Sequence, residues 1–150
     1  MPALSLRAVL LAFALVLAWL DPFAARVADA ATSSCTAFVS DTNQARVNHD
    51  RHIYRQRDHL MHVAQRWAEW MASHHSLRHN PYLTSQVDNW QALGENVGRG
   101  GGEPSIQDAF MGSTEHRDNI LSRTFTQFGI GTARDSDSVL YVDEVFRRPR

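Results

Sequence analysis

The spacing of hydrophobic residues predicts two helices in the first half of the chain. Hydrophobic residues recur every three or four positions over residues 57–75, which predicts the clearest amphipathic helix of the sequence; they are Leu60, Val63, Ala64, Trp67 and Met71. A weaker stripe predicts a helix over Thr36–Val47, with Ser33 or Ser34 as its cap.

The middle of the chain is less periodic. Asn80-Pro81 favours a turn, and residues 77–92 are interpreted as a loop. Pro104 occupies a typical first helical position, and Ile106, Ala109 and Phe110 form the buried stripe of the short helix that follows. Residues 115–123 are typical of another short helix, capped by Ser113 or Thr114.

Near the C-terminal end of the chain, hydrophobic residues recur every second position. Residues 125–133 and 139–146 alternate between hydrophobic and polar side chains, and the polar residues 135–138 join them. This pattern predicts a β-hairpin, and residues 95–99 suggest one more strand. Helices followed by a hairpin indicate an α+β domain built in layers.

The first 30 residues differ from the rest. An early Arg7, a hydrophobic run of about thirteen residues ending at Leu20, and a final Ala28-Asp29-Ala30 are typical of a signal peptide cleaved after Ala30. A membrane anchor is the alternative, but a bilayer span needs ~20 hydrophobic residues. We therefore expect a signal peptide at 1–30, no membrane span in the mature protein, and one domain at 31–150.

The charge of the chain limits which classes of binding partner are expected. The 15 basic residues are all arginine, and with 16 acidic residues they give a net charge of −1. The charges nearly cancel and form no basic cluster that would bind nucleic acid or an anionic membrane surface, so neither is an expected partner.

Cys35 is the single cysteine. It is interpreted as a tolerated thiol near a frayed terminus, with intermolecular pairing or nucleophilic catalysis as alternatives.

The glycine-rich segment "ALGENVGRGGG", residues 92–102, is not a phosphate loop. Glu103-Pro104 follows it, where a Walker loop needs Lys and then Ser or Thr, and Glu103 also stands where a dinucleotide fingerprint needs glycine. No local zinc motif and no serine nucleophile elbow occurs in the sequence. No local pattern singles out a pair of carboxylates for sugar hydrolysis.

Four segments in order resemble the CAP superfamily, the SCP-like domain of secreted cysteine-rich, antigen-type and pathogenesis-related proteins. They are "WMASHHSLRHNPYL", "ALGENVGRGGG", "AFMGSTEHRDNIL" and "FTQFGIGTARDSDSVLYVDEVF". The resemblance covers about Phe38 to Phe146 and is closest to the disulfide-free bacterial branch. It implies an α-β-α sandwich, in which a small antiparallel sheet lies between helical layers, with a central cleft.

The resemblance also implies a site. In the family two histidines and two acids line the cleft and in some members hold a divalent metal. His79 of "RHNP" matches the first histidine, Glu95 of "GEN" the first acid and His116 of "EHRDN" the second histidine. The position of the other acid is Ser113, so three candidate metal ligands remain, the pattern of an open zinc site. Glu115 is next to His116, but successive helical residues point about 100° apart, so Glu115 is not expected to replace that acid.

The glycines suggest how Glu95 is held. Gly94 would permit a tight turn, Asn96 would tolerate unusual φ, and residues 98–102 would bend freely, so that Glu95 points into the cleft beside His79 and His116. The alternative is a structural acid that bonds nearby backbone amides.

Three functions are compatible with these residues. The leading one is a secreted or cell-envelope binding module, expected to be a monomer, for a divalent cation, zinc being favoured, or for a small apolar or lipid-like ligand. The second is a metal-dependent peptide or ester hydrolase in which Glu95 is the general base. The third is a structural interaction protein of the cell envelope. The family's activities vary, so the resemblance does not decide among them.

Overall fold

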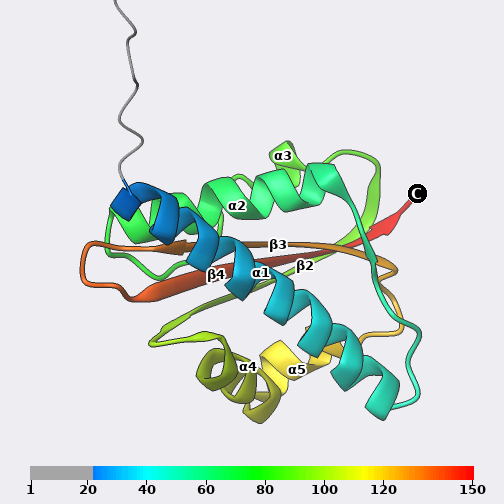
Figure 1. Ribbon diagram of the computed structural model, residues 1–150. Helices are drawn as coiled ribbons and strands as arrows, with labels where there is room; N and C mark the ends of the chain where they lie inside the picture. The colour runs from blue at the N-terminus through cyan, green and yellow to red at the C-terminus, as the bar shows by residue number, and fades with distance from the viewer. Residues whose placement is uncertain (1–21) are drawn as a thin grey trace, which may run out of the picture.

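A computed structural model describes the backbone of residues 22–150 and the side chains of residues 33–150. Its elements in chain order are α1 (Pro22–Asn48), β1 (Arg55–Gln56), α2 (Asp58–Ser73), α3 (Leu83–Gln86), β2 (Trp90–Gly100), α4 (Glu103–Gly112), α5 (Thr114–Ile120), β3 (Gln127–Arg134) and β4 (Leu140–Pro149). Figure 1 shows the sheet between α2 and α3 on one side and α4 and α5 on the other, with α1 running diagonally along it.

The four strands form one sheet in the order β1-β3-β4-β2. β4 pairs antiparallel with both β2 and β3, while β1 pairs parallel with β3 through two residues. β2 is therefore an edge strand. Along it, successive side chains point to opposite faces of the sheet.

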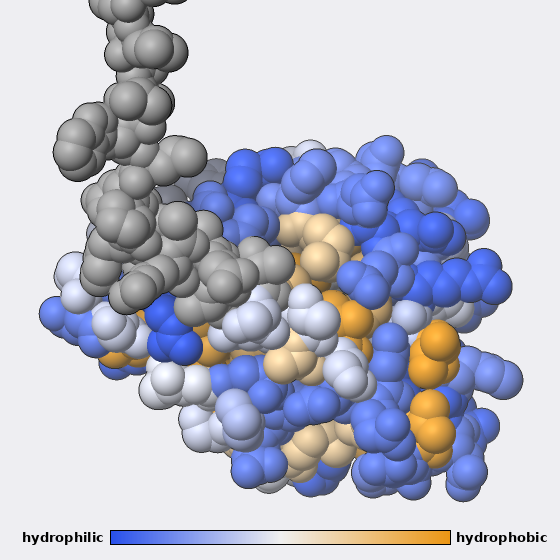
Figure 2. Space-filling view, viewed as in Figure 1, coloured by the Kyte–Doolittle hydropathy of each residue, from blue (hydrophilic) through white to orange (hydrophobic). Residues whose placement is uncertain are grey.

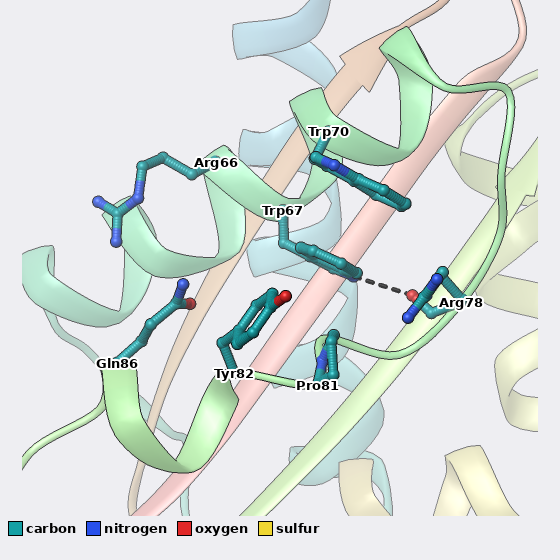
Figure 3. A pocket seen from close by; sticks show the side chains of 7 residues that line it. All are labelled: Arg66, Trp67, Trp70, Arg78, Pro81, Tyr82 and Gln86. Carbon is teal, nitrogen blue, oxygen red and sulfur yellow. Dashed lines mark hydrogen bonds between the residues drawn. The ribbon is translucent and has the colours of Figure 1, made fainter.

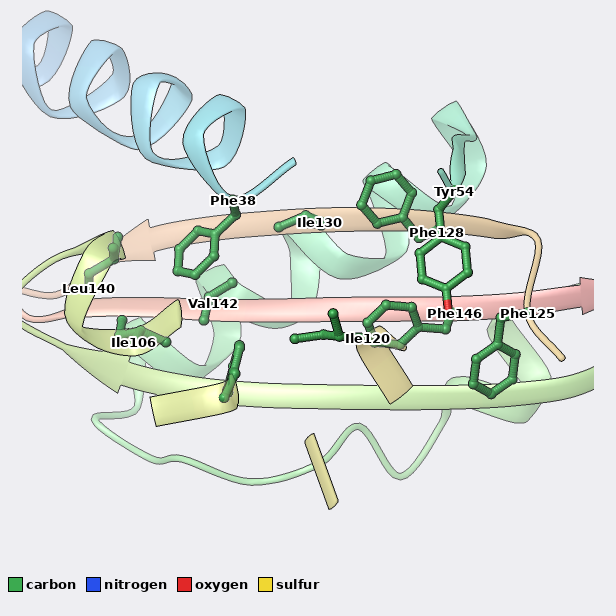
Figure 4. Packing of buried hydrophobic residues seen from close by; sticks show 11 residues of the cluster. Phe38, Tyr54, Ile106, Ile120, Phe125, Phe128, Ile130, Leu140, Val142 and Phe146 are labelled. Atoms are coloured by element: carbon green, nitrogen blue, oxygen red, sulfur yellow. The ribbon is translucent and has the colours of Figure 1, made fainter. Parts of the chain in front are cut away.

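Each face of the sheet has its own hydrophobic core. Phe38 of α1 and Phe110 of α4 pack with Phe128 and Phe146 of the sheet in an aromatic cluster on one face (Figure 4). On the other face the buried side of α2 packs on the strands. The expected α+β fold, with a sheet between helical layers, is confirmed.

Two glycines let α2 lie directly on the sheet. A Cβ atom added to Gly129 would overlap backbone atoms of Leu60 and Met61, and one added to Gly131 would overlap backbone atoms of Ala64 and Gln65. The distances from these added Cβ atoms to the backbone of α2 are below 3.0 Å, and Cβ atoms in proteins essentially never come so close to other atoms. Glycine at these two positions therefore sets the distance between helix and sheet.

Most predicted elements are present, with three corrections. α1 contains Ser33 and Ser34 inside the helix, not at its start, and β2 begins at Trp90, inside the predicted loop that also contains α3. β1 was not predicted.

The predicted signal segment lies largely outside the described residues, and cleavage after Ala30 stays a prediction. Among the side chains that the structure describes, from residue 33 on, the buried ones of α1 are Phe38, Thr42 and Arg46. In residues 22–150 no helix is both long and hydrophobic enough to cross a bilayer.

The surface in the view of Figure 2 is mainly hydrophilic, with small separate hydrophobic areas. Among residues 33–150, the exposed large hydrophobic residues are Val47, Ile53, Leu77 and Tyr82.

Candidate functional site

Glu95 lies within strand β2, not after a turn. Residues 90–100 form one continuous strand, no described glycine has positive φ, and Asn96 is not among the residues with positive φ. Gly94 is required for another reason: an added Cβ would lie 2.8 Å from the Phe125 ring and 2.9 Å from Oδ1 of Asn119. The expectation of a tight turn at Gly94 and of unusual φ at Asn96 was therefore wrong, because Gly94 instead allows close packing beside the strand.

His79 and Glu95 are in direct contact. The segment after α2 passes along the edge strand, so Nδ1 of His79 lies 2.6 Å from Oε2 of Glu95. The backbone N–H of Asn80 donates to both Glu95 oxygens at 3.1 Å. The Glu95 side chain is 6% exposed and that of His79 is 67% exposed. A buried carboxylate thus holds an exposed imidazole by its Nδ1 atom.

Asp143 is a second buried carboxyl beside Glu95, on the face of the sheet that α2 covers. It pairs across β4 with Val97 of β2 and with Gly131 of β3. Within the described part of the chain neither Asp143 oxygen has a hydrogen-bond partner. Burial, and then the negative charges of Glu95 and Glu144, raise the pKa of Asp143 well above its usual range. The raised pKa favours the protonated form of Asp143 next to the Glu95 carboxylate.

Burial also raises the pKa of Glu95, which the hydrogen bonds from His79 and Asn80 partly oppose. The two Glu95 oxygens therefore already have two donors. Asp143 was missed at the sequence level, although an acid at an inward-facing position of a strand is a recognisable signal.

His116 approaches from the opposite layer, in α5. Its Nδ1 atom lies 2.8 Å from Oγ of Ser113, and its ring stacks on Phe110 with centroids 4.9 Å apart. Burial lowers the pKa of His116, the nearby His79 lowers it further, and Glu115 acts in the opposite sense. His116 is therefore held neutral, close enough to His79 to be influenced by its charge.

A buried polar network joins β2 to α5 and α1. Nδ2 of Asn96 donates to the backbone oxygen of His116 at 3.1 Å and to Oε2 of Glu144 at 3.0 Å. Thr42 of α1 donates to Oε1 of Glu144 at 3.0 Å. Burial raises the pKa of Glu144 to about 7, while the bonds from Asn96 and Thr42 oppose that shift. The network places the backbone of His116 beside the edge strand.

The structure thus brings His79 onto Glu95 and places His116 near His79. Both histidines engage Nδ1, and their Nε2 atoms make no hydrogen bond in the described part of the chain. His79, Glu95 and His116 do not form a group with all donor atoms within 4.8 Å. Among the described residues, His75, Asp135 and Asp137 form such a group.

An aromatic hollow of about 380 Å³ lies between α2 and the segment that runs from Arg78 to Gln86. Trp67 and Trp70 stack with centroids 4.6 Å apart, and Nε1 of Trp67 donates to the backbone oxygen of Arg78 at 2.8 Å. Figure 3 shows Tyr82 across from Trp67, with Arg66 and Arg78 on the two sides of the hollow. In the described part of the chain neither arginine forms an ion pair.

Cys35 lies within α1, not at a frayed end. It is half-buried, its Sγ atom donates to the backbone oxygen of Ile130 at 3.2 Å, and burial raises the pKa of its thiol. These properties oppose the thiolate that a nucleophile requires.

Comparison with known proteins identifies a family for the chain. The profile of the cysteine-rich secretory protein family, CAP, matches residues 39–143. No curated protein matches closely enough to count as a relative.

Three similar solved structures are bacterial. An outer surface protein of Borrelia burgdorferi superposes with a TM-score of 0.72 at 13% identity, covering 79% of this chain and 94% of its own. An extracellular SCP-domain protein of Bacillus anthracis gives a TM-score of 0.72 at 20% identity, with 83% of this chain and 43% of its own covered. A cysteine-rich secretory protein of Staphylococcus aureus gives 0.65 at 20% identity, with 77% and 38% covered.

This chain therefore spans almost the whole Borrelia protein but less than half of the other two. Because the family profile matches residues 39–143 and the fold is shared with these structures, the chain belongs to the cysteine-rich secretory protein (CAP) family.

Proposed function

We propose that this domain is an extracellular binding module that takes a divalent cation between Nε2 of His79 and Nε2 of His116. The observation that carries the proposal is the 2.6 Å contact between the buried Glu95 carboxylate and Nδ1 of His79. A carboxylate that accepts from Nδ1 fixes the tautomer in which Nε2 has the free lone pair, as in many zinc sites. Glu95 then orients a ligand, instead of being one.

His116 fits the same role. Ser113 engages its Nδ1 atom, and its lowered pKa keeps the ring neutral, the form that binds metal. Two neutral imidazoles suit zinc or a similar transition-metal ion, which would act here as a Lewis acid able to hold an oxygen of a ligand. Oxygens of water or of that ligand would complete the coordination.

Hydrolysis with Glu95 as general base receives less support. A general base needs a lone pair within hydrogen-bond reach of the water from which it takes a proton. The Glu95 oxygens already accept hydrogen bonds from His79 and Asn80, and the side chain is 6% exposed. We therefore favour binding over catalysis.

The proposed location outside the cell has two supports. The first 30 residues are typical of a signal peptide. The similar proteins of Borrelia and Bacillus are described as an outer surface protein and an extracellular protein.

Titration calorimetry with Zn²⁺ tests the proposal. His116→Ala should abolish one binding event, and Glu95→Gln should weaken it about 10- to 100-fold, because an orienting partner contributes that much. His62→Ala, at an exposed histidine on α2, is the matched control and should titrate like the wild type. Equal isotherms for His116→Ala and the wild type would remove the proposed site.

A structural role for Glu95 gives a different result. In that case Glu95→Gln lowers the melting temperature without changing the zinc isotherm. The same samples therefore separate the two roles.

A small ligand with a hydrophobic part and a negative charge is a second candidate, favoured by the aromatic hollow and its two arginines without ion pairs. A volume of about 380 Å³ is at the small end of the range for ligand pockets, ~300–1,000 Å³. Decanoate should quench tryptophan fluorescence more than decanol does, and Arg78→Gln should remove that difference. Arg148→Gln, at an exposed arginine of β4, should retain it; equal quenching by the two probes would exclude this candidate.

A further inference from the structure

A second group of metal-binding side chains lies where the C-terminal end of α2 meets the loop between β3 and β4. His75 follows the helix, and Asp135 and Asp137 belong to the loop between β3 and β4. One ligand atom from each residue lies within 4.8 Å of the other two. Because 60 residues separate His75 from Asp135, the fold and not the local sequence brings them together.

The end of α2 directs His75 toward the loop. His75 has a φ of 48°, the left-handed conformation that often ends a helix. The N–H of His75 bonds the oxygen of Ala72 at 3.2 Å, and the N–H of Ser76 bonds the oxygen of Met71 at 3.0 Å. The helix end is thus closed by backbone bonds, and the imidazole is free to face the loop.

The loop in turn orients Asp135. Its Oδ1 atom accepts from the N–H groups of Asp137 at 3.0 Å and Val139 at 2.9 Å. Its Oδ2 atom lies 3.1 Å from Nδ1 of His75, and the Asp135 side chain is 3% exposed. One oxygen therefore holds the carboxylate in place, while the other faces the imidazole.

Asp137 has no competing partner. In the described part of the chain its side chain forms no hydrogen bond or ion pair, and no arginine pairs with Asp135. The nearby Arg134 donates instead to the backbone oxygens of Ser138 and Gly101. An open hollow of about 600 Å³ beside the three residues leaves room for water ligands.

We propose that Nδ1 of His75, Oδ2 of Asp135 and the carboxylate of Asp137 bind a divalent transition-metal ion, with zinc as the best match. One nitrogen and two carboxylate oxygens, with water in the remaining position, form an accepted zinc donor set. The Oδ1 bonds of Asp135 supply the outer support that orients a metal ligand. The ion replaces the proton between His75 and Asp135 and joins the end of α2 to the β3–β4 loop.

This site is independent of the one proposed at His79 and His116, so it is tested in the His79→Ala/His116→Ala background. The purified double variant is titrated with Zn²⁺ alone by calorimetry, and one binding event is expected. Adding His75→Ala should abolish it, and adding Asp137→Asn should weaken it at least 10-fold. Asp118→Asn is the matched control, at another exposed aspartate whose side chain has no partner among the described residues. This variant should leave the zinc isotherm unchanged.

A second measurement distinguishes binding from loss of structure. The ¹⁵N resonance of Nδ1 of His75 should shift on adding Zn²⁺ in the double variant, while that of His62 stays in place. Asp137 is exposed, so Asp137→Asn should leave the melting temperature of the metal-free protein unchanged. No zinc binding by the double variant, or an isotherm that His75→Ala leaves unaltered, would overturn the inference.

Discussion

Gly131→Ala should destabilise the fold through a clash between two backbones. The added Cβ would overlap backbone atoms of Ala64 and Gln65 in α2. These are backbone atoms, so the clash cannot be relieved by the movement of a flexible side chain. Carbon atoms prefer separations of about 3.5–4.0 Å, so the helix must retract by about 1 Å. Retraction also loosens the contacts of the α2 core on this face of the sheet.

Overpacking of a well-packed core typically costs ~1–3 kcal/mol, and a backbone overlap belongs at the upper end of that range. For a domain of this size, a loss of ~3 kcal/mol lowers the melting temperature by roughly 10 °C. Thermal unfolding followed by circular dichroism measures the change.

Gly101→Ala is the matched control. No heavy atom lies within 4 Å of a Cβ added there, and Gly101 does not have positive φ. The control should match the wild type or gain up to ~1 kcal/mol, because alanine restricts the unfolded chain. If Gly131→Ala melts within about 2 °C of the wild type, a shift worth less than ~1 kcal/mol, glycine does not set the helix–sheet distance.

Three further expectations concern buried polar groups. Because the pKa of Glu144 rises to about 7 on folding, the folded state keeps a proton that the unfolded state releases. The contribution of Glu144 to the free energy of unfolding is greatest at acid pH and falls by about 3 kcal/mol between pH 5 and 8. Glu144→Gln should remove this part of the pH dependence of the unfolding free energy, measured in urea. An unchanged pH dependence would contradict the prediction. The Cys35 thiol, buried and bonded to Ile130, should react with a thiol reagent at least about 10-fold more slowly than in urea, and equal rates would show an accessible thiol. Arg46 donates to three backbone oxygens and stacks on Tyr54, so Arg46→Lys should cost about 2–4 kcal/mol in chemical unfolding, whereas a cost below about 1 kcal/mol would deny these bonds a structural role.

The regular elements could be predicted because their periodicity reflects burial. The hydrophobic stripe of α2 and the alternation in β3 and β4 both correspond to sides that face the core. β1 could not be predicted, because two residues have no period and Arg55 and Gln56 are extended only through their pairing with Gln127 and Phe128.

The site was less accessible to pattern reasoning. No local rule places His79 beside Glu95; only the family resemblance suggested it, and the contact depends on how the segment after α2 follows the edge of β2. The group of His75, Asp135 and Asp137 was not predicted at all, since its geometry arises from a helix end meeting a hairpin loop.

The buried acids Asp143 and Glu144 change the net charge of the folded protein. The sequence gives an isoelectric point of about 6.7 only if every carboxyl ionises independently. Near that pH the raised pKa values of these two sites keep protons bound that independent carboxyls would release, so the folded protein carries less negative charge than its composition assigns. The native protein should therefore focus at a more alkaline position than its unfolded chain, and it should migrate toward the cathode at a pH where composition alone assigns it almost no mobility.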